Sequence, residues 1–506
     1  VRDRDARVRR VAARRRVVER HAAAVRGLAG ALDRDGEIAL GARRVHDLDE
    51  HEHAVRGGLG ERRGLAVDRV VRHAGADVDL RGGDARGGRG RRLRVRAGAE
   101  RERAENERDE QERRATSALL AVMSSVREFG GAITKPLGAH AGNVETYIEV
   151  PFTLGTQRLF PDGLVRVTRG AKVWTALVEV KTGVNSLRAE QLENYLDIAR
   201  EQGFDAVLTI SNEIPPVAGQ HPTAVDKRKL KKVGLHHLSW SQVLCEAVMQ
   251  KEHRGVADPD QAWILGELIR YLEHPRSGAL EFSDMGDDWV SVRNAVVAGT
   301  LRPNDKTAPG VAARWDALLR FVSLQLGRRL GQEVTPVLSR REQAEPAQRL
   351  QNVLAELLGT GTMSGAVRVP DTVGAINVVA DLRAGQIICH VDLDAPKEGR
   401  PKTRVNWLLR QLSAAPDQVR VEAFVAHSRG PGTAELLGAV RADPAVLIAD
   451  PAKELRAFRV ALTAPLGQKR GRGRGAFIDS VSDAVETFYR DTLHGLAQRA
   501  QTDADL

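Results

Sequence analysis

The sequence predicts a mixed α/β protein, because short apolar strand patterns alternate with amphipathic helix patterns over most of its 506 residues. The run 173–181 is almost continuously apolar, which is typical of a strand buried on both faces. The segment 186–201 has apolar residues at three- and four-residue spacing, which indicates a helix with one buried side. Two cysteines, Cys245 and Cys389, are too few for a disulfide scaffold, and no apolar run approaches the ~18 residues of a membrane span. We therefore expect a soluble cytoplasmic protein.

Residues 1–122 differ in composition from the rest of the chain. They contain no Lys, Pro, Phe, Tyr or Trp, and their 30 Arg and 22 acidic residues give a net charge of +8, most of the chain's +10. This composition is typical either of a charged extension that cannot fold, or of GC-rich DNA translated upstream of a true start near Met123. Both interpretations predict that this segment is dispensable and contacts the rest of the chain little. Its basic charge therefore carries little weight as a sign of a polyanionic partner.

The segment 123–250 is expected to form the first domain, in the order strand, strand, strand, helix, strand, followed by a strand and a helix. Turn residues at 160–163 and 169–170 separate the first strands, and Gly203 ends the first helix. The expected strands are 146–152, 164–168, 173–181, 206–210 and 234–240, and the expected helices are 186–201 and 241–250.

Residues 251–360 are expected to form a helical connecting region, and residues 361–506 a second, mixed α/β accessory domain. In the connecting region we expect helices at 259–275, 311–334 and 340–358. In the last region we expect strands at 366–369, 375–382, 387–393, 419–426 and 446–448, and helices at 403–412, 432–440 and 477–498.

The last region allows two interpretations. Asp371, then Asp392 and Asp394, then Gln411 repeat the outline of the first domain in degraded form, which would indicate an inactive duplicate. The alternative is an α/β accessory domain in which Arg404, Trp407, Arg410 and Gln411 either form a binding surface or simply cover the sheet.

Three charged residues of the first domain are expected to meet at one edge of its sheet. Asp162 stands at a turn between strands, and Glu179 and Lys181 share one face of the next strand because they are two residues apart. Two carboxylates can bind Mg²⁺, and an adjacent ammonium can orient a water molecule or stabilise developing charge. Gln191 and Tyr195, four residues apart, share a face of the following helix. Hydrolysis of a nucleic-acid backbone uses these parts.

The pattern resembles the PD-(D/E)xK nuclease superfamily, through Pro161-Asp162, then Glu179-Val180-Lys181. The run from Gln191 to Tyr195 is similar to the Q-x-x-x-Y element of its RecB and lambda-exonuclease type of branch, although the G-H-x-x-D element of that branch is not evident.

This resemblance implies a restriction-endonuclease-like αβββαβ core and a site for Mg²⁺ or Mn²⁺. The metal ligands would be Asp162, Glu179 and the carbonyl of Val180, and Lys181 would position the attacking water. Gln191 and Tyr195 would lie on the substrate side. An upstream acidic residue completes many such sites, and Glu145 is our first expectation, with Glu149 as the alternative.

A basic run follows the predicted site and can contact phosphates, at Lys227, Arg228, Lys229, Lys231 and Lys232. A second basic run, at Lys469, Arg470, Arg472 and Arg474, alternates with glycines. The sequence therefore predicts a metal-dependent nuclease that acts on nucleic acid, with DNA the expected substrate and no membrane partner. A homodimer or a separate motor protein are possible partners, since the sequence has no Walker A motif. The alternative is a catalytically inactive protein of the same fold that binds nucleic acid or another protein.

Overall fold

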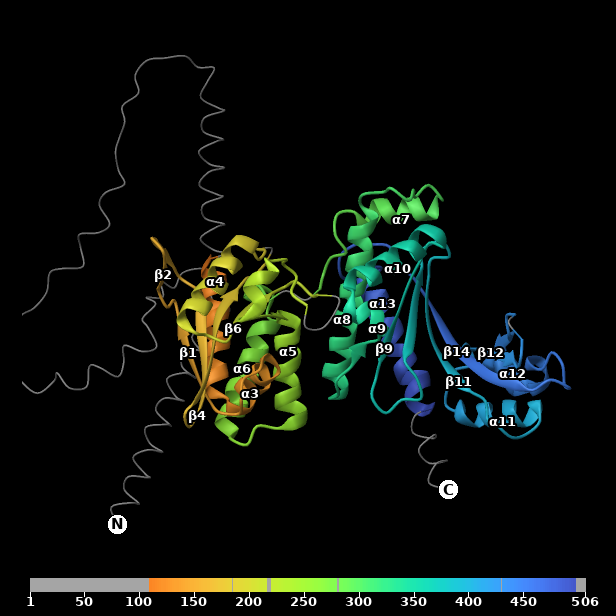
Figure 1. Cartoon of the computed structure of the whole chain (residues 1–506). Coiled ribbons are helices and arrows are strands. Elements are labelled where there is room, and N and C mark those ends of the chain that lie inside the picture. Colours follow the sequence, from red (N-terminus) through yellow and green to blue (C-terminus); the bar gives the residue numbers. More distant parts are fainter. Residues whose placement is uncertain (1–108, 184, 216–219, 280–281, 429, 497–506) are drawn as a thin grey trace, which may run out of the picture.

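The computed structural model describes residues 109–183, 185–215, 220–279, 282–428 and 430–496, and contains two large β-sheets with helices packed on each (Figure 1). The protein is thus mixed α/β, as the sequence predicts. No helix in the described part of the chain combines the length and apolar character needed to cross a membrane.

The first sheet has five strands and mixed topology. In spatial order they are β1 (Asn143–Ile148), β4 (Gly163–Arg169), β5 (Lys172–Val180), β6 (Ala206–Ser211) and β7 (Gly234–Ser239). β4 is antiparallel to both β1 and β5, whereas β5, β6 and β7 are parallel to one another. Their carboxyl ends therefore meet at one edge of the sheet.

Helices cover both faces of this sheet (Figure 1). One face packs on α4 (Ala189–Gln202), through apolar residues such as Leu177 and Leu196. The other face packs on a helix at 109–125 and on α3 (Arg127–Thr134), α5 (Trp240–Val248) and α6 (Pro259–Glu273). A short hairpin of β2 (Phe152–Leu154) and β3 (Gln157–Leu159) lies beside α4.

The helix at 109–125 corrects the expectation that residues 1–122 contact the rest of the chain little. Ala115, Leu119 and Leu120 are at most 1% exposed and belong to the main core of the first sheet. Leu120 packs so closely on Gly163 that a Cβ atom there would lie 2.4 Å from Leu120 Cδ1. Alanine and leucine supply this apolar surface without any aromatic residue. The remainder of the segment, residues 1–108, lies outside the described residues.

The predicted helical connecting region is divided between the two cores. Its first helix, α6, packs with the first sheet, whereas the following helices pack with the second, α9 (Arg340–Ala344) only through its contact with α10 (Pro346–Gly359). These are α7 (Trp289–Val297), α8 (Ala308–Leu330), α9 and α10, so the single helix expected at 340–358 is two. Pro346 begins the second of them.

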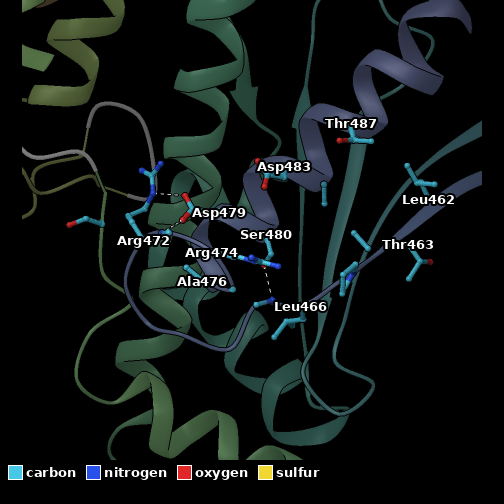
Figure 2. A pocket seen from close by; sticks show the side chains of 17 residues that line it. Leu462, Thr463, Leu466, Arg472, Arg474, Ala476, Asp479, Ser480, Asp483 and Thr487 are labelled. Atoms are coloured by element: carbon cyan, nitrogen blue, oxygen red, sulfur yellow. Dashed lines mark hydrogen bonds and ion pairs between the residues drawn. The ribbon is translucent and has the colours of Figure 1, made fainter.

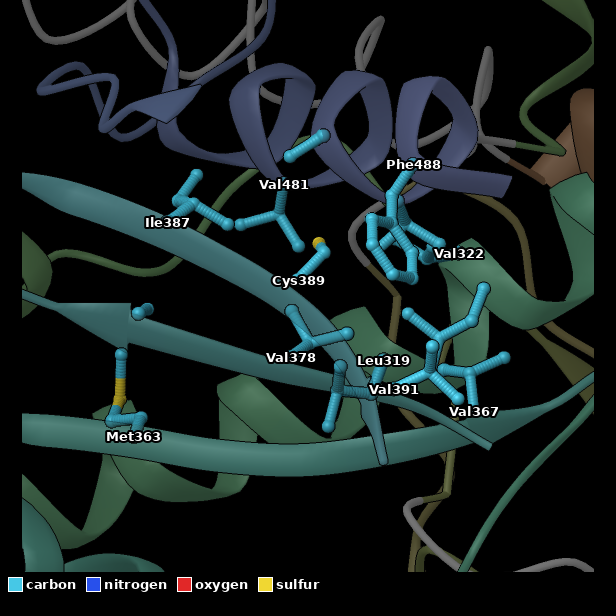
Figure 3. Close-up of a cluster of buried hydrophobic side chains, with 14 of the residues drawn as sticks. Leu319, Val322, Met363, Val367, Val378, Ile387, Cys389, Val391, Val481 and Phe488 are labelled. Atoms are coloured by element: carbon cyan, nitrogen blue, oxygen red, sulfur yellow. The ribbon is translucent and has the colours of Figure 1, made fainter. Parts of the chain in front are cut away.

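The second sheet has seven strands, and every neighbouring pair is antiparallel. In spatial order they are β13 (Thr433–Leu436), β12 (Arg420–Val425), β14 (Leu455–Pro465), β11 (Gln386–Asp394), β10 (Ile376–Asp381), β9 (Thr362–Arg368) and β8 (Thr335–Pro336). Side chains of α8 and of α13 (Phe477–Phe488) fill the core on one face, among them Leu319, Val322, Val481 and Phe488 (Figure 3).

The structure of this region differs from the prediction in four respects. The longest strand, β14, was not predicted and lies between β11 and β12. The helix expected at 432–440 is the strand β13 followed by a short helix, α12 (Leu437–Ala442), and the strand expected at 446–448 falls at the end of a 3₁₀ turn, Pro444–Leu447. The all-antiparallel sheet also does not repeat the mixed topology of the first, so the inactive duplicate is not supported.

Of the other predicted helices, α11 (Pro401–Gln411) is present, and α13 continues as a π turn at Tyr489–Leu493.

Candidate active site

The two predicted carboxylates lie side by side where β4 and β5 pair. Gly163 lies opposite Val178, which brings the preceding residue, Asp162, to Glu179 and Val180. Asp162 Oδ2 accepts a hydrogen bond of 2.7 Å from the backbone N–H of Val180. Glu179 is only 1% exposed although it carries a carboxylate. Burial of such a group indicates that strong polar partners compensate for its lost hydration.

Glu179 is the centre of the hydrogen-bonded site. Its Oε1 atom lies 2.7 Å from the amine of Lys181 and accepts a 2.7 Å hydrogen bond from the side-chain amide of Gln191. The same amide lies 3.1 Å from the Tyr195 hydroxyl, which donates to the carbonyl of Phe160 at 3.4 Å. The structure thus brings Asp162, Glu179, Lys181, Gln191 and Tyr195 together, from the turn before β4, the end of β5 and α4.

A third acidic residue, Glu112, comes from the helix at 109–125, and the sequence analysis missed it. Glu112 Oε2 lies 3.3 Å from the amine of Lys181. Its Oε1 accepts hydrogen bonds from the side-chain amide of Asn185 at 2.5 Å and from the backbone N–H of Thr182 at 3.4 Å. The amine of Lys181 therefore lies between two carboxylates. Local spacing could not reveal Glu112, which is 69 residues from Lys181 and in the segment set aside for its composition.

Glu145, the expected upstream acid, is not brought to this site. It lies on β1 opposite Arg166, which in turn lies opposite Thr175, four residues before Glu179 on β5. Four strand residues span about 13 Å. The alternative, Glu149, has its backbone N–H bonded to the carbonyl of Asp162, but its side chain pairs with Arg113 and is largely exposed. The acid that reaches the site is Glu112.

The ionisation of these groups depends on burial and on their neighbours. Burial and the adjacent Glu179 carboxylate raise the pKa of Asp162 to about 7, although the Val180 N–H and the Lys181 ammonium oppose the shift. Burial disfavours the Lys181 ammonium, but the Glu179, Asp162 and Glu112 carboxylates outweigh it and raise the pKa of the amine. Burial and the Glu179 charge also raise the pKa of the Tyr195 hydroxyl. Lys181 therefore remains a cation and Tyr195 keeps its proton near neutral pH.

The donor atoms of the site fit a hard divalent cation. Glu179 Oε2 and Gln191 Oε1 are buried and have no hydrogen-bond partner among the described residues. A cation beside Glu179 Oε2 would satisfy this atom and remove the repulsion between Glu179 and Asp162. No cluster of three or more His, Cys, Asp or Glu residues suited to a metal occurs in the described part of the chain. Two carboxylates are nevertheless sufficient for Mg²⁺, which usually retains several water ligands. The carbonyl of Val180 as a further ligand stays a prediction.

A separate hydrogen-bonded cluster of a threonine and two histidines lies next to the site in the sheet. Glu179 lies opposite Thr209 on β6, and Thr209 lies opposite His237 on β7. Thr209 Oγ1 lies 2.8 Å from His221 Nε2 and 2.9 Å from His237 Nδ1. Burial lowers the pKa of His237 to about 4, against the hydrogen bond that its Nε2 atom makes with the carbonyl of Glu213. These polar groups satisfy one another and join the loop after β6 to the sheet.

The predicted basic run lies at one side of α4, and its five residues have different roles. Lys229 lies 2.7 Å from Asp197 and 3.7 Å from Glu193, which attaches this 3₁₀ turn (Lys227–Lys231) to α4. Arg228 pairs with Asp226. The other three are exposed and make no ion pair with any described residue, namely Lys227, Lys231 and Lys232.

A large cavity lies away from this site, in the second sheet unit. It has a volume of about 1030 Å³ and lies between the end of β14, the glycine-rich loop at 466–476 and α13 (Figure 2). Arg472, from the second predicted basic run, pairs there with Asp479, and Arg470 pairs with Asp284 and Asp287. These ion pairs reduce the positive charge that the run can offer to a phosphate.

The surface predicted around Arg404 is mostly internal. Arg404 is 4% exposed and donates to the carbonyls of Leu455, Lys397 and Gly399, so it supports the chain around α11. Gln411 is also buried. Trp407 instead lines a cavity of about 500 Å³ together with Phe424, Arg456 and Arg459.

No protein-family model, curated protein sequence or solved structure matches this chain. Any functional assignment therefore depends on the residues of the site themselves.

Proposed function

We propose that this protein is a metal-dependent nuclease of the PD-(D/E)xK type, which hydrolyses phosphodiester bonds of nucleic acid, with DNA as the expected substrate. The observation that supports it most is the buried Glu179, whose second oxygen has no partner among the described residues while Asp162 and Lys181 lie beside it. The resemblance to the superfamily implies a pair of carboxylates with an ammonium beside them. It also implies a glutamine and a tyrosine on the helix that follows. The order of the strands and of α4 around them is consistent with a restriction-endonuclease-like core.

Asp162 and Glu179 would hold Mg²⁺ or Mn²⁺, which when bound polarises a phosphate oxygen and lowers the pKa of a water molecule. The ammonium of Lys181, fixed by Glu179 and Glu112, would orient the attacking water and stabilise negative charge as it develops on the phosphate. Because the pKa of Lys181 is raised, it acts as a cation and not as a general base. Gln191 restrains the Glu179 carboxylate, and Tyr195 connects Gln191 to the backbone of Phe160, two residues before Asp162.

The proposal is tested by comparing Glu179→Gln with wild type on single-stranded and duplex DNA and RNA, in Mg²⁺, Mn²⁺ or EDTA. We expect cleavage by wild type in Mg²⁺ or Mn²⁺, no cleavage in EDTA, and loss of at least about a hundredfold in Glu179→Gln. The matched control is Glu190→Gln, which removes an exposed carboxylate at the start of α4, next to Gln191. It should cleave like wild type.

Two outcomes would contradict the proposal. Cleavage by Glu179→Gln at the wild-type rate would assign the activity to another site or to a contaminant. Metal-independent binding of nucleic acid by wild type, without cleavage of any substrate, would favour the inactive binding module instead.

A further inference from the structure

Two residues just before Asp162, namely Arg158 and Phe160, are exposed and contact each other beside the site. Phe160 is 51% exposed, and the only other exposed aromatic residue in the described part of the chain is Trp263, on α6 across the sheet. The guanidinium carbon of Arg158 lies 5.1 Å from the centre of the Phe160 ring. Arg158 is itself exposed and has no ion pair with any described residue. An exposed aromatic ring with a cation beside it offers the two features that proteins use to bind single-stranded nucleic acid, a stacking face and a positive charge.

The surrounding structure holds this pair in place. The inward side chains of the β2–β3 hairpin, Phe152, Leu154 and Leu159, pack on the apolar cluster around α4. Phe152 also meets Phe204 edge to face, with ring centres 5.9 Å apart. The outward residue Arg158 lies opposite Thr153 in the hairpin. The hairpin is thus a packed support that presents Arg158 and Phe160 to solvent.

The stacking pair is also fixed relative to the proposed catalytic groups. Only Pro161, with its restricted backbone, separates Phe160 from Asp162. The carbonyl of Phe160 accepts from Tyr195, which is linked through Gln191 to Glu179. A group stacked on Phe160 would therefore lie next to a phosphate at Asp162 and Glu179, with Arg158 able to contact a neighbouring phosphate.

We propose that Phe160 and Arg158 bind an unpaired base next to the scissile phosphate, so that the substrate is single-stranded nucleic acid or a frayed end. Bases stack on aromatic rings regardless of sequence, and Arg adds a cationic contact. Inside a duplex, neighbouring bases already cover both faces of each base, so Phe160 can stack only on a base that is unpaired or has left the helix. The position of the base next to the scissile bond rests on the proposed nuclease function, whereas stacking itself does not.

The test uses the full chain in EDTA, which separates binding from cleavage. The probes are a single-stranded oligonucleotide that contains 2-aminopurine and its blunt duplex, followed by fluorescence and anisotropy. We expect wild type to quench 2-aminopurine in the single strand and to bind it at least about tenfold more tightly than the duplex. Phe160→Ala should lose the quenching and about tenfold in single-strand affinity, with duplex affinity unchanged.

Two further variants control for packing and for surface aromatics. Phe160→Leu keeps an apolar side chain and should fail like Phe160→Ala, because leucine cannot stack on a base. Trp263→Ala removes the other exposed aromatic and should bind like wild type. Unchanged quenching in both Phe160 variants, or an equal loss for single strand and duplex, would overturn the inference.

Cleavage assays in Mg²⁺ then separate the two proposals. If wild type stacks the base but cleaves nothing, the nuclease proposal fails and the stacking surface stands. If wild type cleaves single strand and blunt duplex equally, and Phe160→Ala does the same, the nuclease proposal stands and the stacking surface fails.

Discussion

The amine of Lys181 lies between Glu179 and Glu112 and forms an ion pair with each of these two carboxylates. We expect Lys181→Ala to lower cleavage by about a hundredfold or more, since it deletes a cation aimed at the developing charge. Metal binding should remain, because both proposed metal ligands are intact. Isothermal titration with Mn²⁺ would check this, with Glu179→Gln as the variant that should lose binding. Loss of Mn²⁺ binding in both variants would place Lys181 in the folding of the site instead.

His237 predicts a pH dependence of stability. Its pKa is lowered to about 4 in the folded protein by burial, whereas an unfolded histidine titrates near its ordinary 6.5. Between these values the unfolded chain binds the proton and the folded chain does not. The free energy of unfolding should therefore fall as the pH drops from about 6.5 to about 4, by up to about 3 kcal/mol from this residue. Burial lowers the pKa of His221 and His236 in the same direction.

Urea unfolding at a series of pH values measures this effect. His237→Gln keeps an amide that can bond to Thr209 and to the Glu213 carbonyl, but it does not titrate. We expect its stability to change less steeply with acid than that of wild type. If the free energy of unfolding of His237→Gln and of wild type falls equally steeply with acid, groups other than His237 determine the pH dependence of stability.

The site residues that could be predicted from sequence are those within one continuous stretch. Asp162, Glu179, Lys181, Gln191 and Tyr195 belong to neighbouring elements, and the strand and helix periods already place them on one side. Glu112 could not be predicted in this way, because its contact depends on how a distant helix packs on the sheet.

At the level of elements, the helix at 109–125 predicts a sharp difference between two truncated proteins. A chain that begins at residue 109 should retain the stability and activity of the full chain. A chain that begins at Met123 loses Leu119, Leu120 and Glu112, and with them several kcal/mol of apolar burial and a partner of Lys181. We expect it to unfold at a much lower temperature or not to fold. Matching melting curves for the two would contradict the packing described here.

The basic 3₁₀ turn predicts a change in salt dependence. Replacing Lys227, Lys231 and Lys232 with Ala should weaken nucleic-acid binding about equally for all sequences. It should also reduce the slope of log affinity against log salt, by about one for each phosphate that a lysine no longer neutralises. Lys229→Ala is the contrasting variant, because it breaks ion pairs with Asp197 and Glu193 and should mainly lower stability. If the slope of log affinity against log salt is unchanged in the triple variant, these three lysines do not contact phosphates.

The first sheet was predictable because its strands are short apolar runs bounded by turn residues. The second sheet was less predictable from the sequence. β14 alternates apolar Phe458, Val460 and Leu462 with other residues, a strand signal that was present, but its pairing depends on strands far back in the chain. At 432–440 the residues before Leu437 have helix-compatible composition, yet they pair with β12. Tertiary pairing overrides such local preference.

At the scale of the whole molecule, each sheet has its own core, and the proposed site lies wholly within the first. The main contact between the two units runs along α5 and α8, where Cys245 Sγ donates to the carbonyl of Leu324 at 3.6 Å. We expect a fragment of residues 109–279 to fold and to bind Mn²⁺ as the full chain does, measured by circular dichroism and calorimetry. Failure of this fragment to fold, while the full chain is stable, would show that the second unit supports the first.

The position of β14 has a consequence for how the second unit forms. Its neighbours β11 and β12 are made early, but neither can complete its pairing until residues 455–465 have been synthesised and inserted between them. Such non-local pairing slows folding and leaves strand edges open in the meantime. An emerging or shortened chain that ends before residue 455 would therefore expose two unpaired edges and a bare apolar face. It is the kind of intermediate that chaperones bind and that aggregates when they do not.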